Sequence, residues 1–213
     1  SLPKGVEIVH RNVATLLDAA SADVLVVVAH TASGVELAVV DGGAAGVGRH
    51  QRESLDLTRE FATVEFTGVE ATRVTGPYLE ERLRRVRSLL MIALAAEQVG
   101  IARQCLEMTV DYAKTRQQFG RTIGSFQALK HRLVDMLVAT ELAEATVLDA
   151  ADVDRFVDAD LAERAASARV LASRAAIYAA EEAIQIHGGI GFTWEHPLHH
   201  HFRRAKTDQL LFQ

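Results

Sequence analysis

The sequence predicts an α+β protein: part of an antiparallel β domain, followed by an antiparallel four-helix bundle. Roughly the first 75 residues hold short apolar and alternating runs that are separated by glycine-containing turns. After them, apolar residues recur at helical spacing, and no proline occurs between Pro77 and Pro197. The hydrophobic fraction of 49% is enough for a real core.

The β region is predicted from two aliphatic runs and one alternating segment. Residues 24–28 and 35–40 have strand length, and Thr31-Ala32-Ser33-Gly34 between them is typical of a hairpin turn. Asp41-Gly42-Gly43 is expected to end the second strand. Residues 63–67 alternate in polarity, which predicts a third strand with one face toward solvent.

Helical periodicity begins after the break at Gly76-Pro77. Residues 79–114 carry apolar side chains near helical spacing and predict one long helix. A stripe between residues 126 and 140 predicts a second helix, with Ser125 as its N-cap or in its first turn.

Two more helices complete the predicted bundle. The third runs from about residue 154 to 186, is rich in alanine, and is expected to end at Gly188-Gly189. A shorter fourth helix is expected after Pro197. Short connections favour an antiparallel bundle. The alanine-rich helix is expected to pack closely on another helix, either within this bundle or at a subunit interface.

Composition and charge argue against several classes of protein. The net charge of −5 gives no indication of nucleic-acid binding. The single cysteine, Cys105, leaves no internal disulfide and suits a reducing compartment. No continuous apolar run reaches about 18 residues, and residues 1–5 do not resemble a signal peptide. We therefore expect a cytoplasmic protein that binds neither nucleic acid nor a membrane.

Two segments are unusual for a plain helical bundle. Residues 116–127, RQQFGRTIGSFQ, include two arginines, which can bind phosphate through charge-assisted bonds, and phenylalanines that can lie against an aromatic ring. Residues 185–192, QIHGGIGF, have glycines that allow close backbone approach to a ligand. From these residues alone, an interhelical loop and a helix C-cap are favoured. A third glycine-rich stretch, residues 42–48, is interpreted as a loop because it lacks the strand and helix that flank a phosphate cradle.

In this order and separation, the two segments resemble the C-terminal helical domain of the acyl-CoA dehydrogenase family. That family carries R-x-x-F-G-x-x-[IL]-x-x-[FH]-Q and, later, Q-x-x-G-G-x-G-F. The matching residues are Arg116, Phe119, Gly120, Gln127, Gln185, Gly188, Gly189, Gly191 and Phe192, with further similarity at 22–23, 55–59, 64–66, 193–197 and 203–206. The resemblance implies that residues 1–76 are the remainder of the family's middle β domain and that 77–213 form its helical bundle domain.

The resemblance also implies a reaction and a cofactor. The family performs FAD-dependent α,β-desaturation of an acyl-CoA thioester: a carboxylate removes the α proton while the β hydride passes to the flavin. Carried over, Arg116 would pair with the pyrophosphate of an FAD held mainly by a neighbouring subunit, and Phe119 would pack near it. Contacts to the adenosine and phosphate portion would come from Gln127, Gln185, Gly188 and Gly189.

The chain departs from the family in two ways. The family's N-terminal part has no counterpart here, which a trimmed chain, proteolysis or a naturally short subunit would each explain. The two family positions for the catalytic base are occupied by Leu90 and Phe212, which cannot accept a proton. Glu97 and Glu107 lie on the same predicted helix as Leu90 and are interpreted as solvated residues. No catalytic residue is therefore assigned.

Some members of the family work as heteromers of two unlike subunits, best known in bacterial steroid catabolism. One subunit then supplies the base and the other does not. We expect this chain to be the base-lacking kind, active only in a dimer or tetramer with a homologous subunit, on a steroid or fatty acyl-CoA. The alternatives are a scaffold subunit that binds no flavin and an active homo-oligomer whose base lies elsewhere.

Two clusters of basic residues are interpreted without a catalytic role. His196, His199, His200 and His201 are expected at a surface or interface rather than at a metal, since a metal site needs defined geometry and usually further ligands. A second cluster is expected to form a solvated or interfacial helix face, with a role near CoA phosphates as the weaker alternative; it comprises Arg82, Arg84, Arg85 and Arg87.

Overall fold

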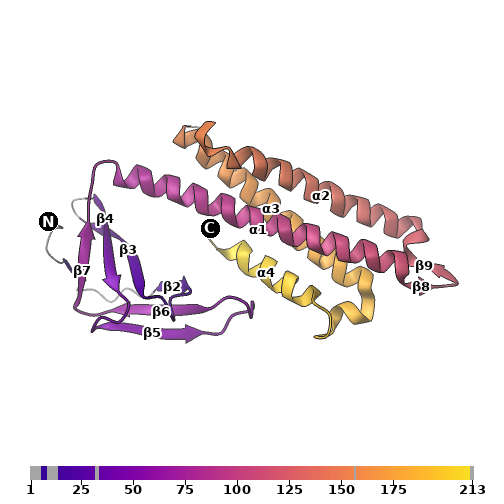
Figure 1. Ribbon diagram of the computed structural model, residues 1–213, viewed down its shortest axis with the longest axis horizontal. Coiled ribbons are helices and arrows are strands. Elements are labelled where there is room, and N and C mark those ends of the chain that lie inside the picture. The colour runs from indigo at the N-terminus through magenta and orange to yellow at the C-terminus, as the bar shows by residue number, and fades with distance from the viewer. Residues whose placement is uncertain (1–5, 9–13, 32–33, 156, 212–213) are drawn as a thin grey trace. The chain divides into compact units, whose positions relative to one another are not determined.

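The computed structural model describes residues 6–8, 14–31, 34–155 and 157–211 (Figure 1). The chain divides into two compact units, residues 1–83 and 84–213. Antiparallel strands fill the first unit and four helices dominate the second, so the predicted α+β class is confirmed. The assignment of residues 1–76 to a middle β domain stays a prediction.

The first unit contains two antiparallel sheets among its described residues. The four-stranded sheet has the order β1 (Val6–Ile8), β7 (Val69–Val74), β4 (Gly34–Asp41) and β3 (Val24–Thr31). The three-stranded sheet has the order β2 (Ala14–Leu17), β6 (Phe61–Phe66) and β5 (Val47–Arg52). Their buried side chains share one core, which includes Val40, Val64, Phe66 and Val69.

The predicted hairpin is formed by β3 and β4. Its register runs from Val24 opposite Asp41 to Thr31 opposite Gly34. Residues 32–33 of the predicted turn lie outside the described residues. Asp41 ends β4 as expected, and its side-chain oxygen accepts a hydrogen bond from the Gly43 N–H at 2.8 Å.

Two details of the β region differ from the prediction. Thr63 was expected on the solvent-facing side of its strand, but it is buried, because Arg52 reaches it and donates a hydrogen bond to its Oγ1 at 2.6 Å. Gly48 lies inside β5 rather than in a loop. Strands β1, β2, β5 and β7 were not predicted from the sequence.

Helices α1 (Leu79–Thr115), α2 (Gln127–Ala151), α3 (Asp158–His187) and α4 (Leu198–Leu210) form the bundle of the second unit. The three long helices lie alongside one another in Figure 1, and α3 contacts both α2 and α4. Gly188 ends α3 and Pro197 precedes α4, as predicted.

The starts of α2 and α3 correct the prediction. Ser125 is not the N-cap of α2, because it ends a 3-10 turn, η1 (Ile123–Ser125), and its hydroxyl donates to the Thr122 carbonyl at 2.7 Å. The N-cap is Phe126. Helix α3 starts at Asp158, a few residues later than predicted, because residues Val153–Arg155 form a separate 3-10 turn, η2.

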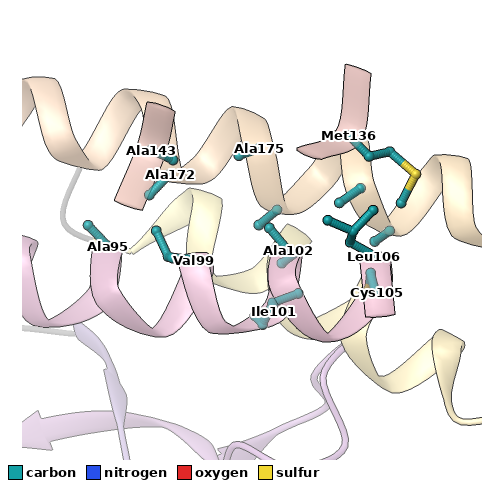
Figure 2. Close-up of a cluster of buried hydrophobic side chains, with 14 of the residues drawn as sticks. Ala95, Val99, Ile101, Ala102, Cys105, Leu106, Met136, Ala143, Ala172 and Ala175 are labelled. Atoms are coloured by element: carbon teal, nitrogen blue, oxygen red, sulfur yellow. The ribbon is translucent and has the colours of Figure 1, made fainter. Parts of the chain in front are cut away.

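Small side chains allow the helices of the bundle to pack closely. Figure 2 shows side chains of α1, including Ala95, Val99 and Ala102, gathered with Ala172 and Ala175 of α3. Cys105 is fully buried there, and burial raises the pKa of its thiol to about 12. Not every residue of the predicted stripes is buried: Leu90 and Leu137 are exposed.

Helix α1 also meets the length and composition of a membrane span. Its most apolar 18-residue window has a mean hydropathy of 1.4, although the sequence holds no uninterrupted apolar run of that length. Half of this window is buried within the protein. A core helix of a bundle has the same properties, and we assign α1 as one.

Candidate functional site

The first unusual segment folds as a small hairpin between α1 and α2. Its strands are β8 (Gln117–Gln118) and β9 (Arg121–Thr122), with Gln118 opposite Arg121. The two turn residues, Phe119 and Gly120, both have positive φ, at 53° and 77°. Such angles are typical of a type I′ turn. For a bulky residue they are strained, and strain of this kind gathers at functional sites.

This hairpin is held firmly against the ends of α1 and α2. The Ile123 N–H donates to the Arg116 carbonyl at 2.8 Å. A Cβ on Gly124 would lie 2.8 Å from the Ala113 carbonyl oxygen, so glycine is required for this close approach. The guanidinium of Arg121 lies 3.9 Å from the centre of the Phe126 ring. Phe119, by contrast, is 91% exposed.

The second unusual segment follows directly from α3. Gly188 has a φ of 62° and opens a 3-10 turn, η3 (Gly188–Phe192). A Cβ on Gly188 or Gly189 would meet no other part of the protein within 4 Å, so the backbone of both is open to approach. A Cβ on Gly191 would lie 2.7 Å from the Ile184 carbonyl oxygen. The first two glycines therefore leave space for a ligand, whereas Gly191 serves packing.

The structure brings the two segments to one end of the bundle (Figure 1). The Tyr112 hydroxyl donates to the His187 carbonyl at 3.3 Å, and the two rings stack with their centroids 4.2 Å apart. Sequence reasoning missed both residues. His187 lies inside the quoted motif, but its partner is 75 positions away on another helix.

His187 is almost completely buried at this junction. Its Nδ1 lies 2.7 Å from the Ala183 carbonyl oxygen, and its ring centroid is 4.6 Å from that of His196. Burial lowers the pKa of His187, and His196 lowers it further, while the hydrogen bond to Ala183 acts in the opposite direction. The pKa of His196 is also lowered, mainly by burial and then by His199.

The predicted cofactor-binding residues lie around this junction. Arg116 follows the last turn of α1, Gln127 begins α2, and Gln185 lies in the last turn of α3. All three side chains are exposed, as are Gly188 and Gly189. Their assignment as FAD ligands stays a prediction.

The predicted base positions lie elsewhere. Leu90 is exposed on α1, about 38 Å from Thr115 by helical rise, and Phe212 is outside the described residues. Glu97 is partly exposed and forms an ion pair with Arg204 of α4, a contact that the prediction of a solvated face did not include. Glu107 is exposed.

The basic clusters make contacts of their own. Across the described residues, no three His, Cys, Asp or Glu side chains are placed to hold a metal ion. His199 packs on Trp194 and His200, with ring centroids 4.7 and 3.9 Å apart. Arg85 departs from the predicted solvated or interfacial face, since it donates to Asp158 at 2.9 Å and joins the starts of α1 and α3.

Comparison with known proteins matches this fold to one family. Residues 83–212 match the family described as acyl-CoA dehydrogenase, C-terminal domain. Over 122 residues, the chain is 54% identical to acyl-CoA dehydrogenase IpdE2 of Mycobacterium tuberculosis, covering 57% of this chain and 36% of that relative. The chain thus spans about a third of that protein's length.

Two solved assemblies have the same fold. One chain of the ChsE4-ChsE5 complex from Mycobacterium tuberculosis superimposes with a TM-score of 0.83 at 28% identity, covering 99% of this chain and 59% of the other. A chain of the Tcur3481-Tcur3483 steroid ACAD, a G363A variant, gives a TM-score of 0.85 at 25% identity, covering 99% and 58%. On the evidence of its family match, its fold and its paired motifs, this chain belongs to the acyl-CoA dehydrogenase family.

Proposed function

We propose that this chain is the base-lacking subunit of an FAD-dependent acyl-CoA dehydrogenase, and that it helps to hold FAD while an unlike subunit supplies the catalytic carboxylate. The observation that carries this proposal is the convergence of the 116–127 and 185–192 segments, joined by Tyr112 and His187. Each segment alone has only the features of an interhelical loop or a helix C-cap. Together they form one open, polar end of the bundle.

The residues at this end fit a dinucleotide. Arg116 is exposed and has a planar guanidinium that can donate two parallel bonds to a pyrophosphate. Gln127 and Gln185 would offer amide groups to the adenosine and phosphate portion. The open backbone at Gly188 and Gly189 would allow those groups to come close. The bound FAD would supply the hydride acceptor of the reaction.

Phe119 supports the same reading. Its ring is 91% exposed although its backbone is held in a strained, left-handed conformation. A flexible loop would relax such a conformation, whereas this hairpin is fixed by the bonds on either side of it. The exposed ring would lie against the cofactor.

Leu90 supports the division of labour between subunits. It cannot accept a proton, and it lies far along α1 from the cofactor-binding end. The ChsE4-ChsE5 and Tcur3481-Tcur3483 assemblies, which this chain resembles over 99% of its length, are named for two different chains. We therefore propose a homologous partner, an acyl-CoA substrate of steroid or fatty acyl type, and a cytoplasmic hetero-oligomer.

One face of α2 fits such a partner. Val134, Val138 and Leu142 recur every four residues and are exposed, with the exposed Leu137 beside them. We refer to these four residues as the α2 face. Exposed apolar patches of this kind mark protein interfaces, and the unlike subunit is the occupant that we propose for it.

The test measures flavin in the assembled complex. The complex is obtained by co-expressing this chain with the product of the gene that lies next to its own in the genome. Visible flavin absorbance per complex should fall in Arg116→Ala and recover partly in Arg116→Lys, whose point charge lacks the planar fork. Lys114→Ala is the matched control, because it removes a nearby exposed positive charge without touching either segment. Unchanged flavin in Arg116→Ala would favour a scaffold that binds no FAD through this end.

A further inference from the structure

We infer that Tyr112 and His187 are positioning residues that set the spacing between the two cofactor-binding segments; this inference rests on the proposed function. Neither is among the residues assigned above to contact the cofactor. Tyr112 is one helical turn before Arg116, whose N–H donates to the Tyr112 carbonyl at 2.8 Å. His187 is directly bonded to Gly188. The pair therefore joins the backbones of both segments, through the stacked rings and through the hydrogen bond from the Tyr112 hydroxyl to the His187 carbonyl.

Both ends of this contact are fixed in orientation. The His187 ring is held by its own helix, because Nδ1 lies 2.7 Å from the Ala183 carbonyl. A carbonyl can only accept, so Nδ1 carries the hydrogen in the neutral ring. The Tyr112 ring stacks on it at an interplanar angle of 21°, and the Tyr112 hydroxyl reaches past it to the His187 carbonyl. Rotation of either ring would break one of these contacts.

This arrangement favours a neutral imidazole. Among the described residues, the titratable side chains in ring contact with His187 are Tyr112 from α1 and His196 from the segment before α4, with His199 beyond His196. None of these is a carboxylate that would stabilise a positive charge. Protonation would place an imidazolium in a buried site next to a second histidine, which is unfavourable.

The direction of the pH effect follows from the lowered pKa of His187. When the Tyr112 and His187 rings are in contact, His187 binds a proton less readily than when they are apart. The contact is therefore fully present above the ordinary histidine pKa of about 6.5 and weakens as pH falls below it. Because this contact sets the spacing of the two segments, FAD affinity should decline over the same pH range.

The experiment titrates FAD into the flavin-depleted assembled complex at neutral and acidic pH. Tyr112→Leu should raise the FAD Kd about tenfold, because two segments must then be ordered on binding. Tyr112→Phe, which keeps the stacked ring, should stay much nearer to the unmodified protein. His187→Phe keeps a ring that cannot be protonated and should flatten the decline below pH 6.5.

Arg116→Ala, measured in the same series, distinguishes the proposed cofactor site from the positioning role of Tyr112 and His187. If Arg116→Ala leaves the FAD Kd unchanged, the proposed cofactor site is wrong. If it weakens binding while Tyr112→Leu binds FAD normally, only the positioning role is wrong. Should Tyr112→Leu fail to fold, the pH profile decides: a His187→Phe complex with the same acid decline as the unmodified protein would overturn the inference.

Discussion

Arg169 of α3 donates a hydrogen bond to Oε1 of Gln98 on α1 at 2.7 Å, within an otherwise alanine-rich core. The same guanidinium donates to the carbonyls of Asp208 and Leu211 at the end of α4. One buried side chain thus connects three helices. Burial lowers the pKa of Arg169, with the nearby Asp208 acting in the opposite direction.

Replacing Arg169 should therefore destabilise the bundle. Arg169→Leu leaves the Gln98 oxygen and the α4 carbonyls without this donor, and an unpaired buried polar group costs about 1–3 kcal/mol. We expect the free energy of unfolding, measured in urea, to fall by about that amount or more. The double variant Arg169→Leu with Gln98→Leu should recover part of the loss, because it removes one stranded group.

Arg164→Leu provides the matched control on the same helix. Arg164 pairs with Asp149 at the surface, where such a pair contributes about 0–1 kcal/mol. If Arg169→Leu and Arg164→Leu shift the urea midpoint equally, the buried Arg169 network contributes no more to stability than the surface pair of Arg164 and Asp149.

Local patterns in the sequence were sufficient for the main architecture. Apolar spacing identified α1 and α2, alanine content identified α3, and the glycine pair located its end, because these features depend on neighbouring residues. The β3–β4 hairpin followed from two aliphatic runs. Short strands such as β1 and β2 escaped prediction because three or four residues carry too little periodicity.

Contacts between distant residues could not be predicted in the same way. Ser125 was expected as the N-cap of α2 or in its first turn, but its hydroxyl donates a hydrogen bond within a 3-10 turn whose form depends on Gly124 packing against α1. Thr63 was expected to face solvent, but it is buried and accepts a hydrogen bond from Arg52 of the adjacent strand. The motif residues were found through family resemblance, whereas Tyr112 and Arg169 act across helices and left no local signal.

The α2 face gives a prediction about assembly. Val138 is 60% exposed, and Val138→Glu would place a charge in the proposed apolar interface. We expect the complex to separate into smaller species in sedimentation velocity. Val26→Glu, at an equally exposed valine of β3, should leave the complex intact. An unaltered sedimentation profile for Val138→Glu would place the partner on another surface.

Gly188 and Gly189 should respond differently to substitution. Gly188 has a left-handed φ of 62°, so Gly188→Ala should lower stability by about 1 kcal/mol. Gly189 has neither a positive φ nor a close neighbour, so Gly189→Ala should change stability by less than about 0.5 kcal/mol. The bulkier Gly189→Val should weaken FAD binding more than it lowers helix content, as measured by flavin titration and circular dichroism. Normal FAD binding by Gly189→Val would show that no ligand approaches this backbone.

The position of Leu90 predicts how catalysis is divided. This chain alone should show no acyl-CoA dehydrogenase activity even with added FAD, because neither Leu90 nor Phe212 can accept the α proton. Activity should appear with an unlike subunit. Replacing that subunit's catalytic carboxylate by an amide should slow turnover by about a hundredfold or more while FAD stays bound.

Variants within this chain distinguish a base from a structural carboxylate. Glu97 pairs with Arg204, so Glu97→Gln should loosen α4 from α1 yet leave the chemical step of the folded complex unchanged. Glu107→Gln, at an exposed site on the same helix, is the control. Leu90→Glu should not restore activity to the chain alone, because one carboxylate does not supply the rest of a substrate pocket. Turnover by the purified chain, or loss of proton abstraction in a folded, flavin-loaded Glu97→Gln complex, would place the base in this subunit after all.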